Sequence, residues 1–199
     1  MKKMFMVAVG LLCLAGVFAT GTTSTKEKVL SPISIYDKGH ILELSMEDVG
    51  KYHGDICPCV VVSFRAMKLA ISKLWGKEIP NRKDFKIISS LPTDGSEDTF
   101  EFITRAKKRG DFSFDLPQGT GKLKMSEKNY SFVFIKKSTD KRIKVSVKKE
   151  VFQEIDDRFF KIRKRIKLKK ATKKEEKIFE LEKSKLKYVF MSLPPEDLF

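Results

Sequence analysis

The sequence predicts an α+β protein with a single domain, in which an antiparallel sheet packs against helices. Residues 130–136 alternate aromatic with non-aromatic side chains, and residues 142–148 alternate apolar with polar ones; both patterns are typical of strands. Residues 58–75 and 172–191 are long segments that begin with helix start signals. Residues 20–199 are enough for one domain with a proper core.

The first residues have the pattern of a secretory signal peptide. Two lysines precede residues 4–18, which carry no charge, and a Val17-x-Ala19 cleavage site follows. The apolar run is shorter than the ~20 residues that span a bilayer. We expect a signal peptide at 1–19, a secreted or periplasmic protein, and no integral membrane span after cleavage. Residues 20–44 are expected to form a flexible lead-in to a domain at 45–199.

The first two helices have distinct start signals. Residues 45–48 resemble a capping box and predict a short helix that ends near residues 50–54. Proline suits the first position of a helix, so Pro58 predicts a second helix with Cys57 at its N-cap and Cys59 at its second position.

The rest of the chain is predicted to alternate between strands, helices and turns. Gly, Pro and Asp residues mark the turns, and apolar periodicity separates strands from helices. The expected elements are a strand at 85–91, a helix at 96–108, a loop at 111–121, strands at 123–125, 130–136 and 142–148 with a turn at 138–141, and helices at 150–167 and 172–191.

The chain is strongly basic, with a formal net charge of +15, and it is rich in both lysine and glutamate. Such a surface is common in thermophile proteins and does not require a polyanionic partner. The densest basic stretch, residues 161–187, interleaves glutamates with lysines at helical spacing, which favours a solvated, ion-paired face. It lacks the interleaved aromatic residues that single-strand binding needs, so no nucleic-acid partner is expected. The sequence leaves open whether the protein forms a homodimer.

One short segment holds most of the reactive side chains. Residues 53–59 read His-Gly-Asp-Ile-Cys-Pro-Cys and contain both cysteines that remain after the leader. Thiol and imidazole groups bind soft or borderline metals and act as nucleophile or base near neutral pH. Cysteines at a helix N-terminus also gain from unpaired N–H groups and the helix dipole, which stabilise the thiolate. A disulfide between these two cysteines would close a very small ring and stabilise almost nothing.

Three functions are compatible with these features. In the first, His53, Cys57 and Cys59 bind a transition-metal ion, zinc or alternatively copper, and Asp55 completes the ligand set or orients the histidine. A small-molecule ligand would then bind through that metal. In the second, the protein is an enzyme with Cys57 as nucleophile and His53 as base. In the third, it is a non-catalytic interaction protein whose basic C-terminal stretch docks an acidic partner. It also stays open that the cysteines are simply small core residues.

The same segment resembles a known family. The N-terminal domain of the E subunit of formylmethanofuran dehydrogenase carries a His-Gly-His-x-Cys-Pro-Gly stretch followed by a Tyr-Arg pair, which correspond here to residues 53–59 and to Phe64-Arg65. The family's next landmark, Cys-Gly-x-Asp, corresponds to residues 93–98, and its Gly-Lys-Gly-Asn-Leu loop to residues 119–123. The resemblance implies the family's fold over about residues 45–199, without the C-terminal zinc finger of longer members.

Departures from the family pattern change the implied site. Asp55 and Cys59 stand where the family has His and Gly, and two downstream cysteines are absent, so the implied ligand set differs. Asp98 keeps a family position, and Lys122 lies in the segment that corresponds to the family's Gly-rich loop; both are candidate cofactor-binding residues. Asp94 either lines the same pocket or caps a helix. Predicted export separates this chain from the cytoplasmic formylmethanofuran dehydrogenase complex.

Overall fold

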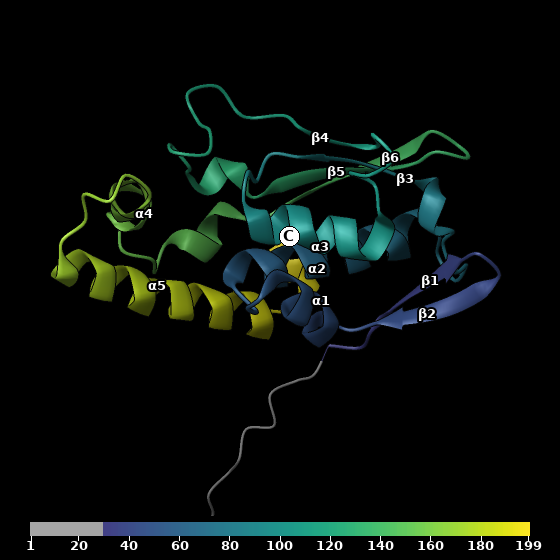
Figure 1. Ribbon diagram of the computed structural model, residues 1–199, viewed down its shortest axis with the longest axis horizontal. Helices are drawn as coiled ribbons and strands as arrows, with labels where there is room; N and C mark the ends of the chain where they lie inside the picture. Colours follow the sequence, from purple (N-terminus) through teal and green to yellow (C-terminus); the bar gives the residue numbers. More distant parts are fainter. Residues whose placement is uncertain (1–29) are drawn as a thin grey trace, which may run out of the picture.

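A computed structural model describes residues 30–199 and has an α+β fold with two sheets (Figure 1). The predicted signal peptide lies outside the described residues, so export stays a prediction. The elements are β1 (Ile33–Asp37), β2 (His40–Leu44), α1 (Met46–His53), α2 (Pro58–Leu74), β3 (Phe85–Ser89), α3 (Asp94–Thr104), β4 (Phe112–Phe114), β5 (Ser131–Lys136), β6 (Lys141–Ser146), α4 (Phe159–Lys167), α5 (Lys173–Ser192) and α6 (Pro195–Leu198), with short 3-10 helices at Arg82–Asp84, Glu127–Asn129 and Lys149–Phe152.

The larger sheet packs one face against α2 and α3 (Figure 1). Its strand order is β4-β3-β5-β6, and its pairs are antiparallel except for the parallel pair of β3 with β4. Phe132 and Phe134 of β5 are fully buried, and the ring of Phe100 from α3 lies edge-on against both, at 5.4 and 5.6 Å between centroids. The alternation predicted for this strand is therefore confirmed, because its aromatic positions face the helices.

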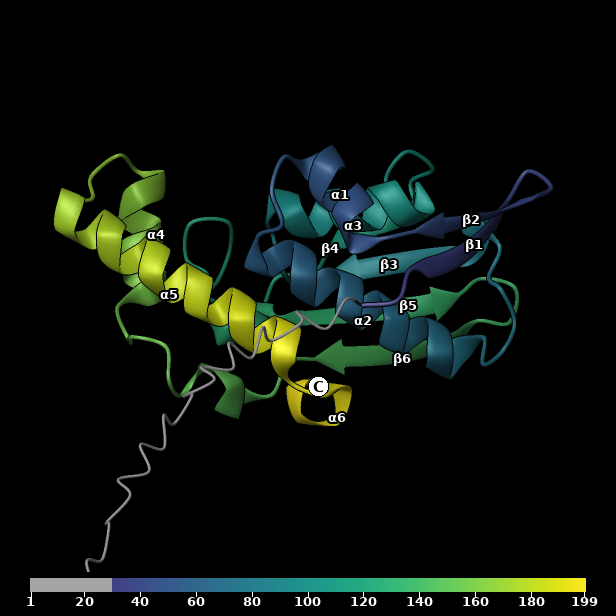
Figure 2. The same cartoon turned by 90° about the horizontal axis from the view of Figure 1, so that it is seen from below.

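Helix α5 crosses α2 on the side away from the sheet, as Figure 2 shows. The buried Arg65 of α2 fixes this contact by donating hydrogen bonds to the carbonyl oxygens of Phe190 and Leu193, where α5 ends. Carbonyls in the last turn of a helix have no partner within the helix, so a guanidinium satisfies them well. The arginine that the family motif singles out thus has a structural role.

The start signals that the sequence shows for α2 and α5 are confirmed. Cys57 is the N-cap of α2 and Pro58 is its first residue. Thr172 caps α5 and forms a reciprocal capping box with Glu175. Of the helices in residues 30–199, none combines the length and the apolar character needed to cross a membrane.

The strands differ from the sequence prediction in two regions of the chain. Residues 33–44, placed in the flexible lead-in, form the antiparallel hairpin of β1 and β2, in which Ile33 and Ile35 are buried. No strand forms at 123–125. Instead Phe112–Phe114, expected to be loop, pairs with β3, because its backbone finds a free strand edge there.

Two helix boundaries also differ. Helix α3 begins earlier than expected because Thr93 accepts a hydrogen bond from the backbone N–H of Ser96 and so caps the helix. The single helix expected at 150–167 is interrupted before α4. There Asp156 accepts hydrogen bonds from both the backbone and the guanidinium of Arg158, which competes with helical hydrogen bonding.

Candidate functional site

The connection between α1 and α2 folds back so that its two ends meet. Gly54 ends α1 in the left-handed conformation, with φ at 97°. Within α1, Gly50 leaves room for the side chain of Ile56, since a Cβ at this position would lie 2.5 Å from Ile56 Cγ1. This close approach holds the connection against α1 and brings His53, the last residue of the helix, next to Cys57.

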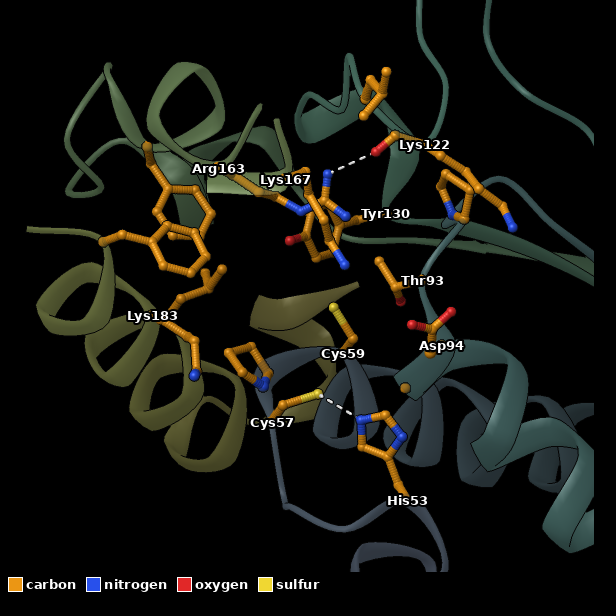
Figure 3. Close-up of a pocket in the computed structure, with 17 residues that line it drawn as sticks. His53, Cys57, Cys59, Thr93, Asp94, Lys122, Tyr130, Arg163, Lys167 and Lys183 are labelled. Carbon is orange, nitrogen blue, oxygen red and sulfur yellow. Dashed lines mark hydrogen bonds between the residues drawn. The ribbon is translucent and has the colours of Figure 1, made fainter. Parts of the chain in front are cut away.

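His53 lies between a thiol and a carboxylate. Its Nε2 is 3.8 Å from Cys57 Sγ, and its Nδ1 donates to Asp98 Oδ2 at 2.7 Å (Figure 3 shows the first of these contacts). The carboxylate fixes the ring orientation and directs Nε2 toward the thiol. Asp98 comes from the first turns of α3, so three helices contribute to this Cys–His–Asp arrangement.

The N-terminus of α3 approaches the thiols closely because it carries a glycine. A Cβ at Gly95 would lie 2.8 Å from Cys57 Sγ and 3.3 Å from His53 Nε2. The N-terminal ends of both α2 and α3 therefore face the same point, and their dipoles and free N–H groups favour negative charge there.

The two thiols are electrostatically distinct. A hydrogen bond from Cys59 is the main cause that lowers the pKa of Cys57 to about 6; burial opposes this shift, while the backbone N–H of Val60 and the charge of His53 support it. The pKa of Cys59 is raised by the same contact with Cys57 and by burial. One thiolate and one thiol is therefore the expected state at neutral pH.

The imidazole complements this thiolate. Burial opposes protonation of His53, yet its pKa is raised because Asp98 accepts its hydrogen bond and Cys57 supplies negative charge. The protonated form of His53 is thus favoured next to the Cys57 thiolate.

Cys57, Cys59 and His53 open onto a pocket of about 420 Å³ (Figure 3). The α1–α2 connection and the start of α3 form one side, and α4 and α5 form the other. Its apolar lining includes Tyr130, Phe159, Phe179, Leu123 and Leu186.

The structure brings most of the predicted site residues together. His53, Cys57, Cys59 and Lys122 all line the pocket, and Asp98 binds His53 from behind. Asp94 also lines the pocket, but Thr93 rather than Asp94 caps α3.

Asp55 stands apart from the other predicted site residues. It is exposed and is not among the residues that line the pocket, so Asp98 rather than Asp55 orients the histidine. Within residues 30–199, moreover, no three His, Cys, Asp or Glu side chains are already grouped so that they could hold a metal ion.

Sequence reasoning missed Tyr130 and three cations on the pocket wall. Arg163 and Lys167 come from α4, and Lys183 comes from α5. All three cations belong to the basic stretch 161–187, which the sequence predicts to be a solvated face. The four-residue spacing of Arg163 and Lys167 places them on one side of a helix, but the periodicity gives no sign of which side faces a pocket.

A comparison with protein-family models decides the relationship. The model described as "FmdE, Molybdenum formylmethanofuran dehydrogenase operon" matches residues 52–199, which include the whole Cys/His segment and both walls of the pocket. The chain belongs to the FmdE family. A search of curated proteins found no match. The family assignment agrees with the motif at residues 53–59 and with the position of Asp98.

Proposed function

We propose that this FmdE-family protein binds a soft transition-metal ion at the floor of the pocket and a small molecule through that ion. Cys57, Cys59 and His53 would be the ligands, and Asp98 would hold His53 in position. Zinc is the first candidate and copper(I) the second, because two sulfurs and one imidazole suit both. Such an ion acts as a Lewis acid and offers an open position to a ligand.

The contact between Cys57 and His53 is the observation that carries this proposal. Their sulfur and nitrogen are 3.8 Å apart. Two such ligands on one tetrahedral zinc ion stand about 3.6 Å apart, given Zn–S and Zn–N bonds of about 2.3 and 2.05 Å. The hydrogen bond from His53 to Asp98 is the carboxylate–histidine contact that commonly supports a metal-binding imidazole. Gly95 keeps the space beside both ligand atoms free of a side chain.

Cys59 would complete the set after a change of rotamer. In Figure 3 its sulfur points away from His53, on the side of Tyr130 and Thr93. The side chain is short and opens onto the pocket, so rotation about one bond is enough to turn the thiol toward an ion held between Cys57 and His53.

Metal analysis of the purified mature protein tests the proposal directly. After exposure to zinc and to copper(I) without chelator, we expect about one equivalent of ion per chain by mass spectrometry, as for a mononuclear site. Cys57→Ser and Cys59→Ser should each abolish retention of the ion. Asp98→Asn should weaken it by about 10- to 100-fold, as loss of a carboxylate partner does at other sites.

Asp55→Asn is the matched control, because it removes the same charge from a residue outside the pocket. This variant should bind the ion like the unchanged protein. If the unchanged protein takes up neither ion while both thiols remain free, the metal proposal is wrong.

One observation favours a second function, that of a cysteine-dependent enzyme. Cys57, His53 and Asp98 lie in the order nucleophile, base and orienting carboxylate, and the pKa of Cys57 is lowered to about 6. Lys122 would then contribute to the polarity of the substrate side of the pocket.

Alkylation of the metal-free protein tests this activation. Because the thiolate is the reactive form, the rate at Cys57 should be half-maximal near pH 6 and should fall as the pH is lowered further. Cys59→Ala should move this midpoint upward, since it removes the main hydrogen bond to the thiolate. Rates followed by intact mass between pH 4 and 10 would show it. A midpoint at the ordinary thiol value of about 8.5 would contradict an activated nucleophile.

A further inference from the structure

The pocket has a strongly uneven distribution of charge. Four cations line it, Lys122, Arg163, Lys167 and Lys183, whereas Asp94 is the single carboxylate residue among the lining residues that the structure describes. These cations come from three separate segments: a loop, α4 and α5. Their convergence on one cavity is therefore a product of the fold and is not explained by the overall composition.

Most of these cations have no carboxylate partner. Lys183 binds Glu180 at 2.8 Å. In contrast, no carboxylate within residues 30–199 lies at ion-pair distance from Lys122, Arg163 or Lys167. Several like charges beside a cavity repel one another unless an anion enters.

The cationic wall is also held in position. Arg163 donates a hydrogen bond to the backbone oxygen of Lys122 at 2.9 Å, which ties the loop to α4 (Figure 3). The stacked rings of Phe159 and Phe179, 5.0 Å apart between centroids, join α4 to α5. Since these rings line the cavity as well, the wall combines positive charge with apolar surface.

We infer that the pocket binds a small organic phosphate, with the phosphate group on Arg163 and Lys167 and the organic part between the aromatic wall and the Cys/His floor. This deepens the proposed function and rests on it for the reactive end of the ligand. A phosphate monoester carries close to two negative charges and three acceptor oxygens, and the planar guanidinium of Arg163 suits such a group. A cavity of about 420 Å³ is within the range of small-molecule sites.

Binding of 1-naphthyl phosphate, measured by calorimetry, tests this inference, with neutral 1-naphthol as the uncharged comparison. We expect the phosphate to bind and the naphthol to bind at least about tenfold more weakly. Arg163→Gln and Lys167→Gln should each weaken binding of the phosphate by about tenfold, because each removes a hydrogen bond to a charged group. Lys161→Gln is the matched control, since Lys161 lies on the same helix outside the pocket. It should leave binding unchanged.

The same titrations on metal-stripped protein and on Cys57→Ser separate this inference from the proposed function. Phosphate binding that persists without metal and depends on Arg163 and Lys167 supports the inference, even where no metal binds. If phosphate binding is lost when the metal is removed but is unaffected by the substitutions of Arg163 and Lys167, the phosphate binds the metal and the inference is wrong. Equal loss in Lys161→Gln, or equal binding of naphthol, overturns it as well.

Discussion

Gly95→Ala should weaken metal binding strongly while leaving the fold intact. The added methyl group would lie 2.8 Å from Cys57 Sγ, closer than such a contact permits, and 3.3 Å from His53 Nε2. The least costly relief is rotation of the Cys57 side chain, which moves the thiol away from the imidazole. We expect metal affinity to fall by at least about a hundredfold, the upper end of what loss of supporting residues causes elsewhere. Competition with a chromophoric chelator would measure it.

The thermal stability of Gly95→Ala distinguishes loss of metal binding from misfolding. Gly95 has an ordinary helical backbone, and alanine is favoured over glycine in helices, so the thermal midpoint should not fall. Gly110→Ala is the control: Gly110 has φ at 75° with open space around it, so alanine there strains the backbone but touches nothing. This control should lose some stability and keep the metal. Metal binding by Gly95→Ala at the unchanged affinity would show that the ion does not lie between Cys57 and His53.

Arg65→Met should destabilise the protein by about 3 kcal/mol, because hydrogen bonds to charged groups contribute about 1.5–3 kcal/mol each. The substitution keeps the apolar stem and removes the guanidinium that binds the carbonyl oxygens of Phe190 and Leu193. It leaves the end of α5 without partners for these buried acceptors. Urea unfolding followed by circular dichroism would give the free energy, and the thermal midpoint should fall by about 6–12 °C.

Lys73→Met provides the comparison, since Lys73 is an exposed cation in the last turn of the same helix. Its free energy of unfolding should change by no more than about 0.5 kcal/mol. An equally small change in Arg65→Met would mean that packing alone holds α5 in place.

The fold was predictable where local chemistry decides it. Pro58 and Thr172 are strong start signals, and both helices begin where they indicate. The short β4 was missed because it pairs with β3, which lies far from it in sequence. The β1–β2 hairpin does carry a local signal, the alternation of Ile33 and Ile35 before a two-residue Lys38-Gly39 turn, which the assignment to a flexible lead-in overlooked.

The reactive half of the site was predictable, and the charged half was not. His53, Cys57 and Cys59 are neighbours in sequence, and the α2 N-terminus sets their positions. Arg163 and Lys183 are far in sequence from the cysteines and the histidine, and they lie on helices whose exposed faces are also basic. Only the packing of α4 on α5 therefore distinguishes the cations of the pocket from those of the surface. The hydrogen bond of His53 to Asp98 spans 45 residues and likewise depends on the tertiary fold.

The pocket is built from two separable parts of the chain. Its sulfur and imidazole groups are supplied before residue 60, whereas three of its cations and its stacked Phe159 and Phe179 belong to the α4–α5 helical hairpin. Substitution of the pocket-facing side chains of α4 and α5 would therefore change which ligand binds, while the Cys/His centre stays the same. A change of ligand choice within this architecture then needs few substitutions, all on the pocket-facing side of α4 and α5.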